Sequence, residues 1–229
     1  MIRTEVIQKI LDKDKARTYL EIGVDRGFNF FRIKARRKIA VDPHFKFSRK
    51  DRLKWALRNP CNAAAKYHEL TSDDYFARAA NSCRPEVVFV DGLHTYEQSL
   101  RDVNNALSRL KEDGVIIMHD CNPPNEAAAC PADSYAHAAS MNLPGWTGEW
   151  CGDVWKTVCH LRSSRNDLRI FVLDCDYGLG IITRGEAEEV LDLSGLVPDE
   201  MTYDELSQDR EQLLNLKDET FLSEFLDTM

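Results

Sequence analysis

The first residues in the sequence that could do chemistry are two acids placed around a glycine turn. Glu21, Gly23, Asp25 and Gly27 form the pattern Glu-x-Gly-x-Asp-x-Gly directly after a short apolar run. Glycine is needed where a backbone bends sharply or lies against a ligand. The dinucleotide-binding pattern Gly-x-Gly-x-x-Gly has a glycine where this sequence has Asp25, and that glycine makes room for a pyrophosphate. A carboxylate would repel a diphosphate, so the turn favours a cofactor with a cationic, phosphate-free part.

A third acid follows at a spacing that fits a nucleoside. Asp42 stands 21 residues after Glu21, at the end of the next apolar run. A carboxylate at the end of a second strand can accept hydrogen bonds from both hydroxyls of a ribose. A glycine turn or a strand-end acid alone is more often structural, but the two together at this spacing predict a ribose-containing cofactor.

A second group of polar residues follows two later apolar runs. It comprises Asp91, His94, His119 and Asp120, with His94 three residues after Asp91. An open α/β sheet presents residues at its strand ends to the ligand cleft. A histidine near its ordinary pKa can accept a hydroxyl proton there. The alternative is that His94 only caps or packs in its turn.

These residues need a sheet whose strand ends meet at one edge. From residue 17 to residue 185 short β-branched runs alternate with helical stretches, a pattern typical of a parallel sheet with crossover helices. We predict the α/β class, with a doubly wound, Rossmann-like, mostly parallel sheet of seven strands and flanking helices. The predicted strands are Thr18–Ile22, Lys38–Val41, Lys66–Leu70, Glu86–Val90, Val115–His119, Arg169–Leu173 and Gly180–Thr183.

Helical segments are indicated by capping patterns. Thr95 with Gln98, and Thr202 with Glu205, each form the S/T-x-x-E/Q box that begins a helix. We predict that residues 1–185 form one cofactor-binding domain. Within it, residues 122–150 would form a lid or insert. Residues 186–229 would form an acidic, helical C-terminal extension packed on the same domain.

Composition excludes several classes of protein. With 229 residues, 43% hydrophobic and 30% charged, the chain is typical of a globular protein. No apolar run approaches the roughly 20 residues that cross a bilayer, and the N-terminal stretch does not resemble a signal peptide. We therefore expect a cytoplasmic protein with no membrane partner. Seven cysteines without a C-x-x-C pair predict reduced thiols.

The charge is unevenly distributed along the chain. Residues 1–60 carry 17 Lys/Arg against 7 Asp/Glu, whereas residues 186–229 carry 2 against 14. A basic segment could contact nucleic acid, but no nucleic-acid motif accompanies it. We interpret the charges as solvated helix faces and expect no nucleic-acid partner.

Several motifs, in order, resemble those of class I S-adenosylmethionine-dependent methyltransferases. They are the glycine turn with Asp42, then Leu-Thr-Ser-Asp-Asp at 70–74, Phe-Val-Asp-Gly-Leu-His-Thr-Tyr at 89–96 and Gly-Val-Ile-Ile-Met-His-Asp at 114–120. The resemblance spans residues 17–122. The last two motifs are similar to those of small-molecule O-methyltransferases of antibiotic and sugar biosynthesis and, more distantly, of catechol O-methyltransferase.

The resemblance implies a set of residues that bind S-adenosylmethionine. Glu21 would approach the methionine amino group, Asp42 would hold the ribose hydroxyls, and Ser72 and Asp73 would lie beside adenine. An acidic lining suits the sulfonium cation. The full implied set is Glu21, Gly23, Asp25, Gly27, Asp42, Ser72, Asp73 and Asp91.

The resemblance also implies residues for methyl transfer. His94 would be the general base, in the position where catechol O-methyltransferase has a lysine, and Asp91, His119 and Asp120 are the other candidates for proton removal. Asp91 and Asp120 resemble the carboxylates that hold magnesium in metal-dependent members. The next residue is Cys121, where the catechol enzyme has asparagine, and a thiol suits magnesium poorly. Both a magnesium site and a metal-free role for the two acids stay open.

We therefore expect a methyltransferase that acts on a hydroxyl of a small-molecule acceptor, such as a sugar or a secondary metabolite. Trp150 and Trp155 would be walls for the acceptor or, alternatively, core residues. The alternative function is a non-catalytic, methyltransferase-like binding or scaffold protein, which the acidic tail suggests. A nucleotide-dependent dehydrogenase is a third hypothesis, which Asp25 disfavours. Assembly into a homo-oligomer also stays open.

Overall fold

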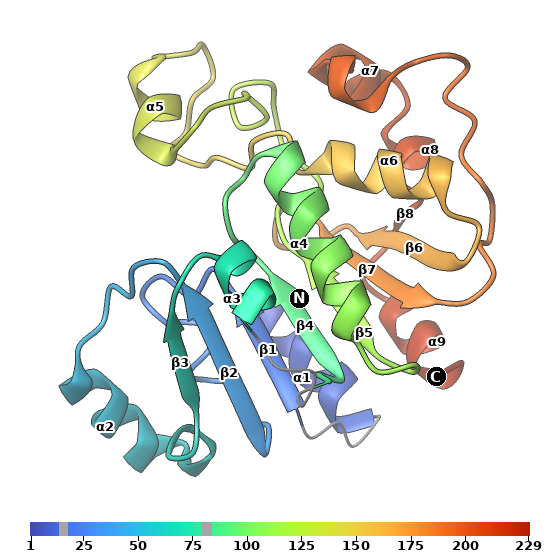
Figure 1. The fold of residues 1–229 in the computed structure, drawn as a ribbon. Helices are drawn as coiled ribbons and strands as arrows, with labels where there is room; N and C mark the ends of the chain where they lie inside the picture. Colours follow the sequence, from blue (N-terminus) through green and yellow to red (C-terminus); the bar gives the residue numbers. More distant parts are fainter. Residues whose placement is uncertain (14–17, 79–83) are drawn as a thin grey trace.

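The computed structural model describes residues 1–13, 18–78 and 84–229. Within these residues an eight-stranded sheet has the order β3-β2-β1-β4-β5-β7-β6-β8 (Figure 1). Strands β1 to β5 run parallel, whereas β7 is antiparallel to both of its neighbours, β5 and β6. The strands are β1 Thr18–Ile22, β2 Arg37–Asp42, β3 Lys66–Glu69, β4 Val87–Val90, β5 Val115–Met118, β6 Leu168–Leu173, β7 Leu179–Arg184 and β8 Leu216–Lys217.

The predicted α/β class and mostly parallel sheet are confirmed, but the sheet has one strand more than predicted. β8 consists of Leu216 and Lys217, which pair with Val172 and Leu173 of β6. Two residues are too few to show the alternation of a strand, and the preceding residues are helical. The acidic tail therefore contributes an edge strand to the same sheet.

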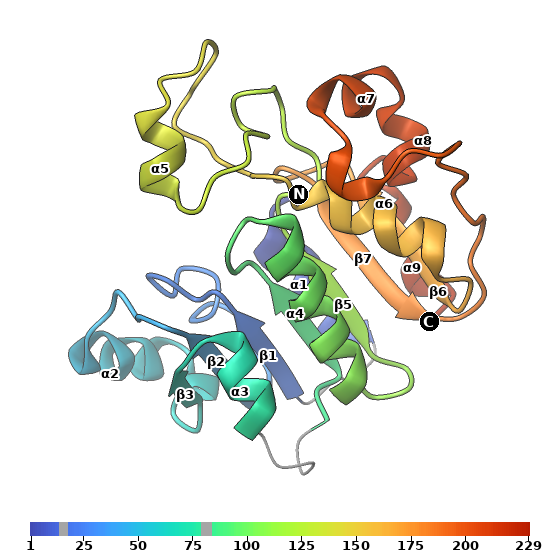
Figure 2. The same ribbon diagram turned by 45° about the horizontal axis from the view of Figure 1, so that its top comes forward.

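Helices cover both faces of the sheet (Figure 2). α1 and α9 pack on one face, while α3, α4, α6, α7 and α8 pack on the other. α2 buries none of its residues. The helices are α1 Arg3–Lys13, α2 Arg49–Arg58, α3 Ser72–Arg78, α4 Tyr96–Arg109, α5 Tyr135–Ser140, α6 Trp155–Ser164, α7 Tyr203–Gln208, α8 Arg210–Leu214 and α9 Phe221–Asp227, with short 3₁₀ turns at Pro60–Asn62 and Pro198–Glu200.

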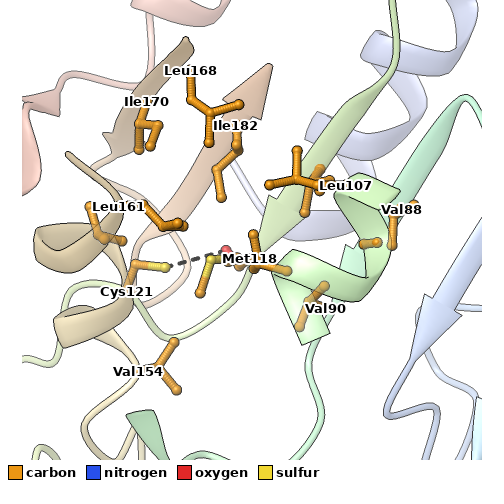
Figure 3. Close-up of a cluster of buried hydrophobic side chains, with 14 of the residues drawn as sticks. Val88, Val90, Leu107, Met118, Cys121, Val154, Leu161, Leu168, Ile170 and Ile182 are labelled. Carbon is orange, nitrogen blue, oxygen red and sulfur yellow. Dashed lines mark hydrogen bonds between the residues drawn. The ribbon is translucent and has the colours of Figure 1, made fainter. Parts of the chain in front are cut away.

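The core is divided by the sheet, because neighbouring residues of a strand point to opposite faces. Every residue of β1, β4 and β5 is buried. Val88, Val90 and Met118 belong to the cluster beneath α4 and α6 (Figure 3). Phe89 and Ile117 belong to the cluster beneath α1 and α9. The sheet is therefore doubly wound, as predicted.

The two predicted capping boxes differ in outcome. Thr202 and Glu205 form a complete box at the start of α7. Thr95 caps α4 by accepting a hydrogen bond from the backbone N–H of Gln98, at 3.4 Å. The Gln98 side chain does not complete the box, because its Oε1 accepts from Arg101 and the backbone N–H of Thr95 donates to the Leu93 carbonyl. The Gln98 amide group donates to Asp102 and Ser72 at 2.9 Å and 3.2 Å. The Gln98 side chain therefore lines a cavity next to the helix start.

The sheet order reverses between β1 and β4, because β2 and β3 lie beyond β1 on one side and β5 lies beyond β4 on the other. Ligands of open α/β sheets bind at such a switch point, beside the carboxyl ends of the strands. The ends of β1, β2, β4 and β5 meet there, and they carry the polar residues singled out above.

The structure also describes the cysteines, the lengths of the helices and the segment 122–150. Cys61, Cys121, Cys130, Cys151, Cys159 and Cys175 are free thiols, and Cys83 lies outside the described residues. No helix in the described ranges is long and apolar enough to cross a membrane. The segment 122–150 contains α5 and buries Ala127, Ala128 and Cys130; its role as a lid stays a prediction.

Candidate functional site

Two adjoining cavities open at the carboxyl ends of the central strands. The larger has a volume of about 670 Å³ and the smaller one of about 540 Å³. Both are lined by Gly23, Asp25, Lys46, Asp91 and Gly92. The glycine turn and the end of β4 therefore form the ridge between them.

The glycine turn is shaped by β4 and by Asp42. Gly23 has a φ of +80°, and a Cβ atom there would lie 1.8 Å from the carbonyl oxygen of Asp91. Only glycine lets the end of β1 approach β4 so closely. Oδ2 of Asp42 accepts hydrogen bonds from the backbone N–H groups of Val24 and Asp25, both at 2.8 Å. Asp42 thus fixes the turn and also lines the smaller cavity, where a ribose was predicted.

Glu21 is buried at the floor of the larger cavity. Its Oε2 accepts hydrogen bonds from the Tyr19 hydroxyl at 2.5 Å and from the Asn29 amide at 2.9 Å. Burial raises the pKa of Glu21 to about 8, although the Tyr19 hydrogen bond opposes the shift. The carboxyl is therefore largely protonated near neutral pH, and a bound cation would favour its ionised form.

Asp25 lies at the rim, between the two cavities. Its side chain is 53% exposed, and its carboxylate is 2.7 Å from Nζ of Lys46. Lys46 therefore balances the charge that would repel a diphosphate. Gly27 ends the turn and faces the ring of Phe31.

The smaller cavity holds an acid that sequence patterns missed. Asp102 of α4 is buried there beside Ser72, and burial raises the pKa of Asp102 to about 6. Asp73 also lines this cavity, but its half-exposed carboxylate lies 3.6 Å from Nε of Arg101. The capping pattern of Thr95 with Gln98 predicted the helix, but it did not show that Asp102 on this helix faces a ligand site.

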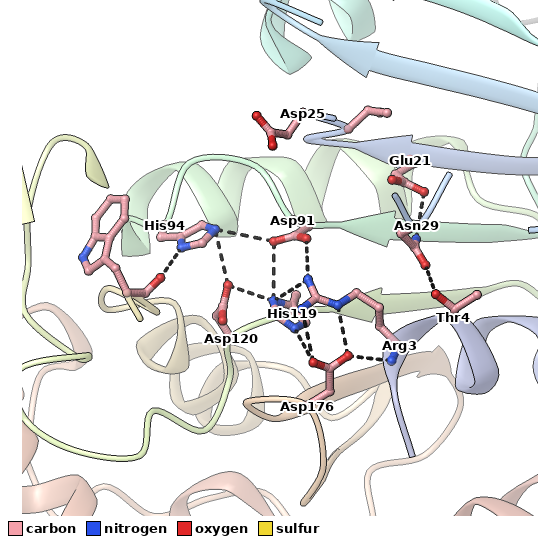
Figure 4. Close-up of polar contacts among 12 residues, drawn as sticks. Arg3, Thr4, Glu21, Asp25, Asn29, Asp91, His94, His119, Asp120 and Asp176 are labelled. Atoms are coloured by element: carbon pink, nitrogen blue, oxygen red, sulfur yellow. Dashed lines mark hydrogen bonds and ion pairs between the residues drawn. The ribbon is translucent and has the colours of Figure 1, made fainter. Parts of the chain in front are cut away.

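The larger cavity contains the predicted group of two acids and two histidines (Figure 4). Nε2 of His94 lies 3.4 Å from Asp91 and 3.3 Å from Asp120. Nδ1 of His119 lies 2.8 Å from Asp120 and 3.5 Å from Asp91. The structure thus brings all four residues together, as the parallel order of β4 and β5 requires.

The charges of this group differ from the sequence-based expectation of an ordinary histidine. Burial alone would lower the pKa of His94, but Asp120 and Asp91 raise it to about 9. Burial is likewise overcome at His119, whose pKa Asp120 and Asp91 raise well above the usual value. The two histidines hold the pKa of Asp91 well below its usual range, against the effect of burial. His94 is therefore a cation in the ligand-free site at neutral pH.

The orientation of His94 is fixed from two sides. Its Nδ1 donates a hydrogen bond to the carbonyl oxygen of Trp150 at 2.7 Å, and its ring stacks on the Trp150 indole with centroids 5.1 Å apart. Gly152 has a φ of +61°, and a Cβ atom there would lie 1.8 Å from the His94 carbonyl oxygen. Nε2 consequently faces the acids and the cavity.

The two tryptophans predicted to line the acceptor site lie in different surroundings. Trp150 lines the larger cavity, together with the more exposed Tyr135 and Tyr177. Trp155 is 1% exposed and packs in the core under α6, so its interpretation as a wall is wrong. Paired tryptophans in a sequence do not show which one faces the cavity.

Arg3 and Asp176 complete the group. Arg3, the first residue of α1, lies 3.0 Å from Oδ2 of Asp91 through Nη1 and 3.0 Å from Oδ2 of Asp176 through Nε. Burial alone would raise the pKa of Asp176, but hydrogen bonds from His119 and Arg3 lower it. No sequence motif pointed to Arg3, because its partner Asp91 is 88 residues away.

The contacts of the acidic group bear on whether a metal ion could bind there. Ligand atoms of Asp91, His94 and Asp120 lie within 4.8 Å of one another, a spacing that a divalent ion could use. The oxygen atoms already face cationic groups, however, and the guanidinium of Arg3 contacts Asp91 directly. Cys121 is no ligand, because it is buried with its thiol near the Met118 carbonyl. As arranged, the residues do not fit a magnesium ion.

Part of the chain matches a known protein family. Residues 20–121 match the model of a family described as a methyltransferase domain. This segment begins within β1 and ends after β5. It contains the glycine turn, Asp42, Asp91, His94, His119 and Asp120. This segment, less than half of the chain, is therefore similar to a methyltransferase domain. No curated protein sequence matches it.

Several solved structures share the fold of this chain. The O-methyltransferase TomG from Streptomyces achromogenes, in complex with SAM, has a TM-score of 0.56 at 11% identity, covering 80% of this chain and 79% of that one. Cofactor-bound Rv0187 from MTB has a TM-score of 0.57 at 15% identity, covering 81% and 82%. An O-methyltransferase from Bacillus cereus in complex with SAH has a TM-score of 0.52 at 16% identity, covering 79% of each chain.

Several residues with an unusual backbone conformation line the larger cavity. Asp25, Asp120, Asp176 and Tyr177 have positive φ angles, at 47°, 61°, 47° and 63°, and all four line the larger cavity. Side chains other than glycine rarely adopt this conformation, and such residues cluster at functional sites. The strain supports the placement of the site independently of its charges.

Proposed function

We propose that the methyltransferase domain transfers a methyl group from S-adenosylmethionine to a hydroxyl of a small-molecule acceptor. The observation that carries the proposal is the position of Asp91, which lines both cavities and lies 3.4 Å from His94. A cofactor along the glycine turn would thus end beside a proton acceptor. TomG and the Bacillus cereus protein are O-methyltransferases, which supports oxygen as the target.

The cofactor would be held by acids that differ in environment. Glu21 would pair with the methionine ammonium group, because a cation stabilises the ionised form of this buried carboxyl. Asp42 would hold the ribose hydroxyls, and Ser72 with Asp102 would lie beside adenine in the smaller cavity. When bound, S-adenosylmethionine supplies an electrophilic methyl group on a sulfonium.

His94 would accept the acceptor's hydroxyl proton at Nε2. The bond from carbon to oxygen forms as the bond from carbon to sulfur breaks, and the proton leaves the oxygen for the imidazole. Since the pKa of His94 is about 9 in the ligand-free site, Nε2 must first release its proton. A cation bound beside Asp91 would offset part of the negative charge of this carboxylate. The carboxylate would then stabilise protonated His94 less, and the pKa of His94 would fall. Asp120 and His119 would hold the imidazole in place.

The competing scaffold hypothesis rested on the acidic tail as an interaction surface. Leu206, Leu213 and Leu214 of this tail are buried in the same core as β5 and α6. The apolar stripe of the tail is therefore used within the chain, and we propose no second function.

Calorimetry and turnover test the proposal in separate steps. Titration of the purified chain with S-adenosylmethionine should show one site per chain, and the absence of heat at about millimolar cofactor would contradict the proposal. On an acceptor found by screening for S-adenosylhomocysteine release, His94→Ala should lower kcat by about 10² to 10⁴, the usual contribution of a general base. His160→Ala, outside both cavities, is the control. Full turnover by His94→Ala would remove His94 from its role.

A further inference from the structure

We propose that Arg3 takes the place of a divalent ion in this methyltransferase, so that methyl transfer needs no metal. The inference rests on the proposed function and concerns the acceptor end of the same site. Its observation is the guanidinium of Arg3 inserted between Asp91 and Asp176, beside the group of Asp91, His94 and Asp120 whose ligand atoms have a spacing that a metal ion could use (Figure 4).

Arg3 contacts Asp91, which belongs to the possible metal-binding group, and Asp176, which lies outside that group. Its Nη1 lies 3.0 Å from Oδ2 of Asp91, its Nη2 lies 3.1 Å from Oδ1 of Asp176, and its Nε lies 3.0 Å from Oδ2 of Asp176. The backbone N–H of Arg3 also donates to Asp176, at 2.6 Å. Both oxygens of Asp176 and one of Asp91 are thus bound to the same permanent cation.

The remaining oxygens of the acidic group face imidazole nitrogens. Oδ1 of Asp91 is 3.4 Å from His94, and Oδ2 of Asp120 is 2.8 Å from His119. A divalent ion among Asp91, His94 and Asp120 would have to displace these groups and would lie next to a guanidinium. Like charges so close in a buried site repel each other strongly.

Arg3 is placed for this task by the rest of α1. Val6, Ile7 and Ile10 are fully buried under the sheet and hold the helix without help from Arg3. The Arg3 side chain is 29% exposed, and it lines the larger cavity. It therefore neutralises Asp91 permanently while leaving a face toward the acceptor. We class Arg3 as a positioning residue that acts through Asp91 and Asp176.

The test begins with the unaltered protein, so it does not depend on a variant that folds. Calorimetric titration with Mg²⁺ and with Mn²⁺ should give no stoichiometric binding at about millimolar metal, and turnover should be unchanged in EDTA. Binding of one ion per chain, or loss of turnover in EDTA that Mg²⁺ restores, would overturn the inference. S-adenosylmethionine titrated into the same sample keeps the two proposals apart, because cofactor binding without metal binding is the expected pair of results.

Variants of Arg3 supply the second arm. Arg3→Met keeps the length of the side chain and frees Asp91 and Asp176, so we expect Mn²⁺ binding to appear, detected by electron paramagnetic resonance. kcat should fall at least tenfold with little change in KM for the cofactor, and Arg3→Lys should restore part of it. Lys9→Met, on the exposed side of α1, is the matched control. An Arg3→Met variant that folds, binds no Mn²⁺ and keeps full kcat would refute the role of Arg3.

Discussion

At the scale of single residues, the cavity combines acids whose environments differ sharply. Glu21 is buried with a hydroxyl and an amide as partners, and its pKa is raised to about 8 by burial. Asp91 is surrounded by two histidines and Arg3, and its pKa lies well below the usual range. One acid is therefore ready to gain a cationic partner, whereas the other already has several. This difference predicts where a cationic ligand adds the most stability.

The state of Glu21 predicts a pH dependence of cofactor affinity. Below pH 8 the ligand-free carboxyl is protonated, so binding of an ammonium group must release that proton. The affinity for S-adenosylmethionine should fall as pH decreases from 8 to 6, at most about tenfold per pH unit. Calorimetry across this range measures the slope. Glu21→Gln should bind more weakly with a flatter slope, and a flat profile in the unaltered protein would contradict this role of Glu21.

The same shift bears on stability with the opposite sign. Glu21 has a folded-state pKa of about 8, above its reference value of 4.5. A raised pKa means that the folded state holds the proton more tightly than the unfolded chain. Its contribution is therefore complete below pH 4.5 and is lost as pH rises toward 8. Bound cofactor should offset that loss.

At the scale of elements, loops beside the glycine turn depend on buried polar contacts. Nζ of Lys38 donates to the carbonyls of Phe30 and Ile33 and to the Asn62 side chain. Asn62 donates in turn to the carbonyl of Phe31, at 2.9 Å. These contacts satisfy the carbonyl oxygens of Phe30, Phe31 and Ile33, and they support the Phe31 ring packed against the glycine turn.

Removing this support should destabilise the fold. Lys38→Met removes the donor to the Phe30 carbonyl and to the Asn62 side-chain oxygen, whereas the Ile33 carbonyl still accepts from Asn59 at 2.9 Å. Each buried acceptor left without a donor costs about 1–3 kcal/mol. We expect the free energy of unfolding to decrease by about 3 kcal/mol, measured by urea denaturation. Lys54→Met, on the exposed helix α2, is the control and should change it little. Equal stability of the two variants would show that the Lys38 contacts contribute nothing.

The loop after Trp150 should control both His94 and stability. A side chain at Gly152 would collide with the His94 carbonyl, 1.8 Å from its Cβ position. Gly152→Ala should therefore cost more than about 1 kcal/mol. It should also lower kcat by up to about 10², because small misplacements of a reacting group are costly. Gly145→Ala is matched, since Gly145 also has a positive φ but no atom within 4 Å. Identical kcat values for the two variants would separate His94 from this loop.

At the scale of the whole molecule, the tail and the sheet form one core. Leu206 of α7 is fully buried in the cluster that contains Met118 and Val158. Leu206→Ala should lower the free energy of unfolding by about 2–5 kcal/mol, the usual range for such a cavity. Leu196→Ala, at an exposed leucine, is the control. An unchanged stability in Leu206→Ala would mean that the tail is separate from the domain, against our proposal that residues 186–229 pack on it.

The sequence predicted the sheet and the clustering of polar residues at its strand ends, because both depend on local patterns. Strand-end acids at regular spacing placed Glu21, Asp42, Asp91 and Asp120 at one edge, since parallel strands bring their carboxyl ends together. Patterns could not find Arg3, because its neighbours come from strands far along the chain. They could not find β8 either, since two residues carry no alternation.

The charge states of the residues in the cavity could not be predicted from the sequence either. The ordinary pKa expected for His94 was wrong, because the shift depends on Asp120 and Asp91 around a buried ring. Which tryptophan faces the cavity depends on packing as well, and only Trp150 does so. Residue types therefore indicated the chemistry, while charge states required the assembled fold.

A crystal structure of the chain with S-adenosylhomocysteine tests the central claim most directly. We predict the ligand's ammonium group beside Glu21, its ribose at Asp42 and its sulfur facing the space in front of Nε2 of His94. Density for the ligand away from the glycine turn, or a sulfur directed away from His94, would contradict the account.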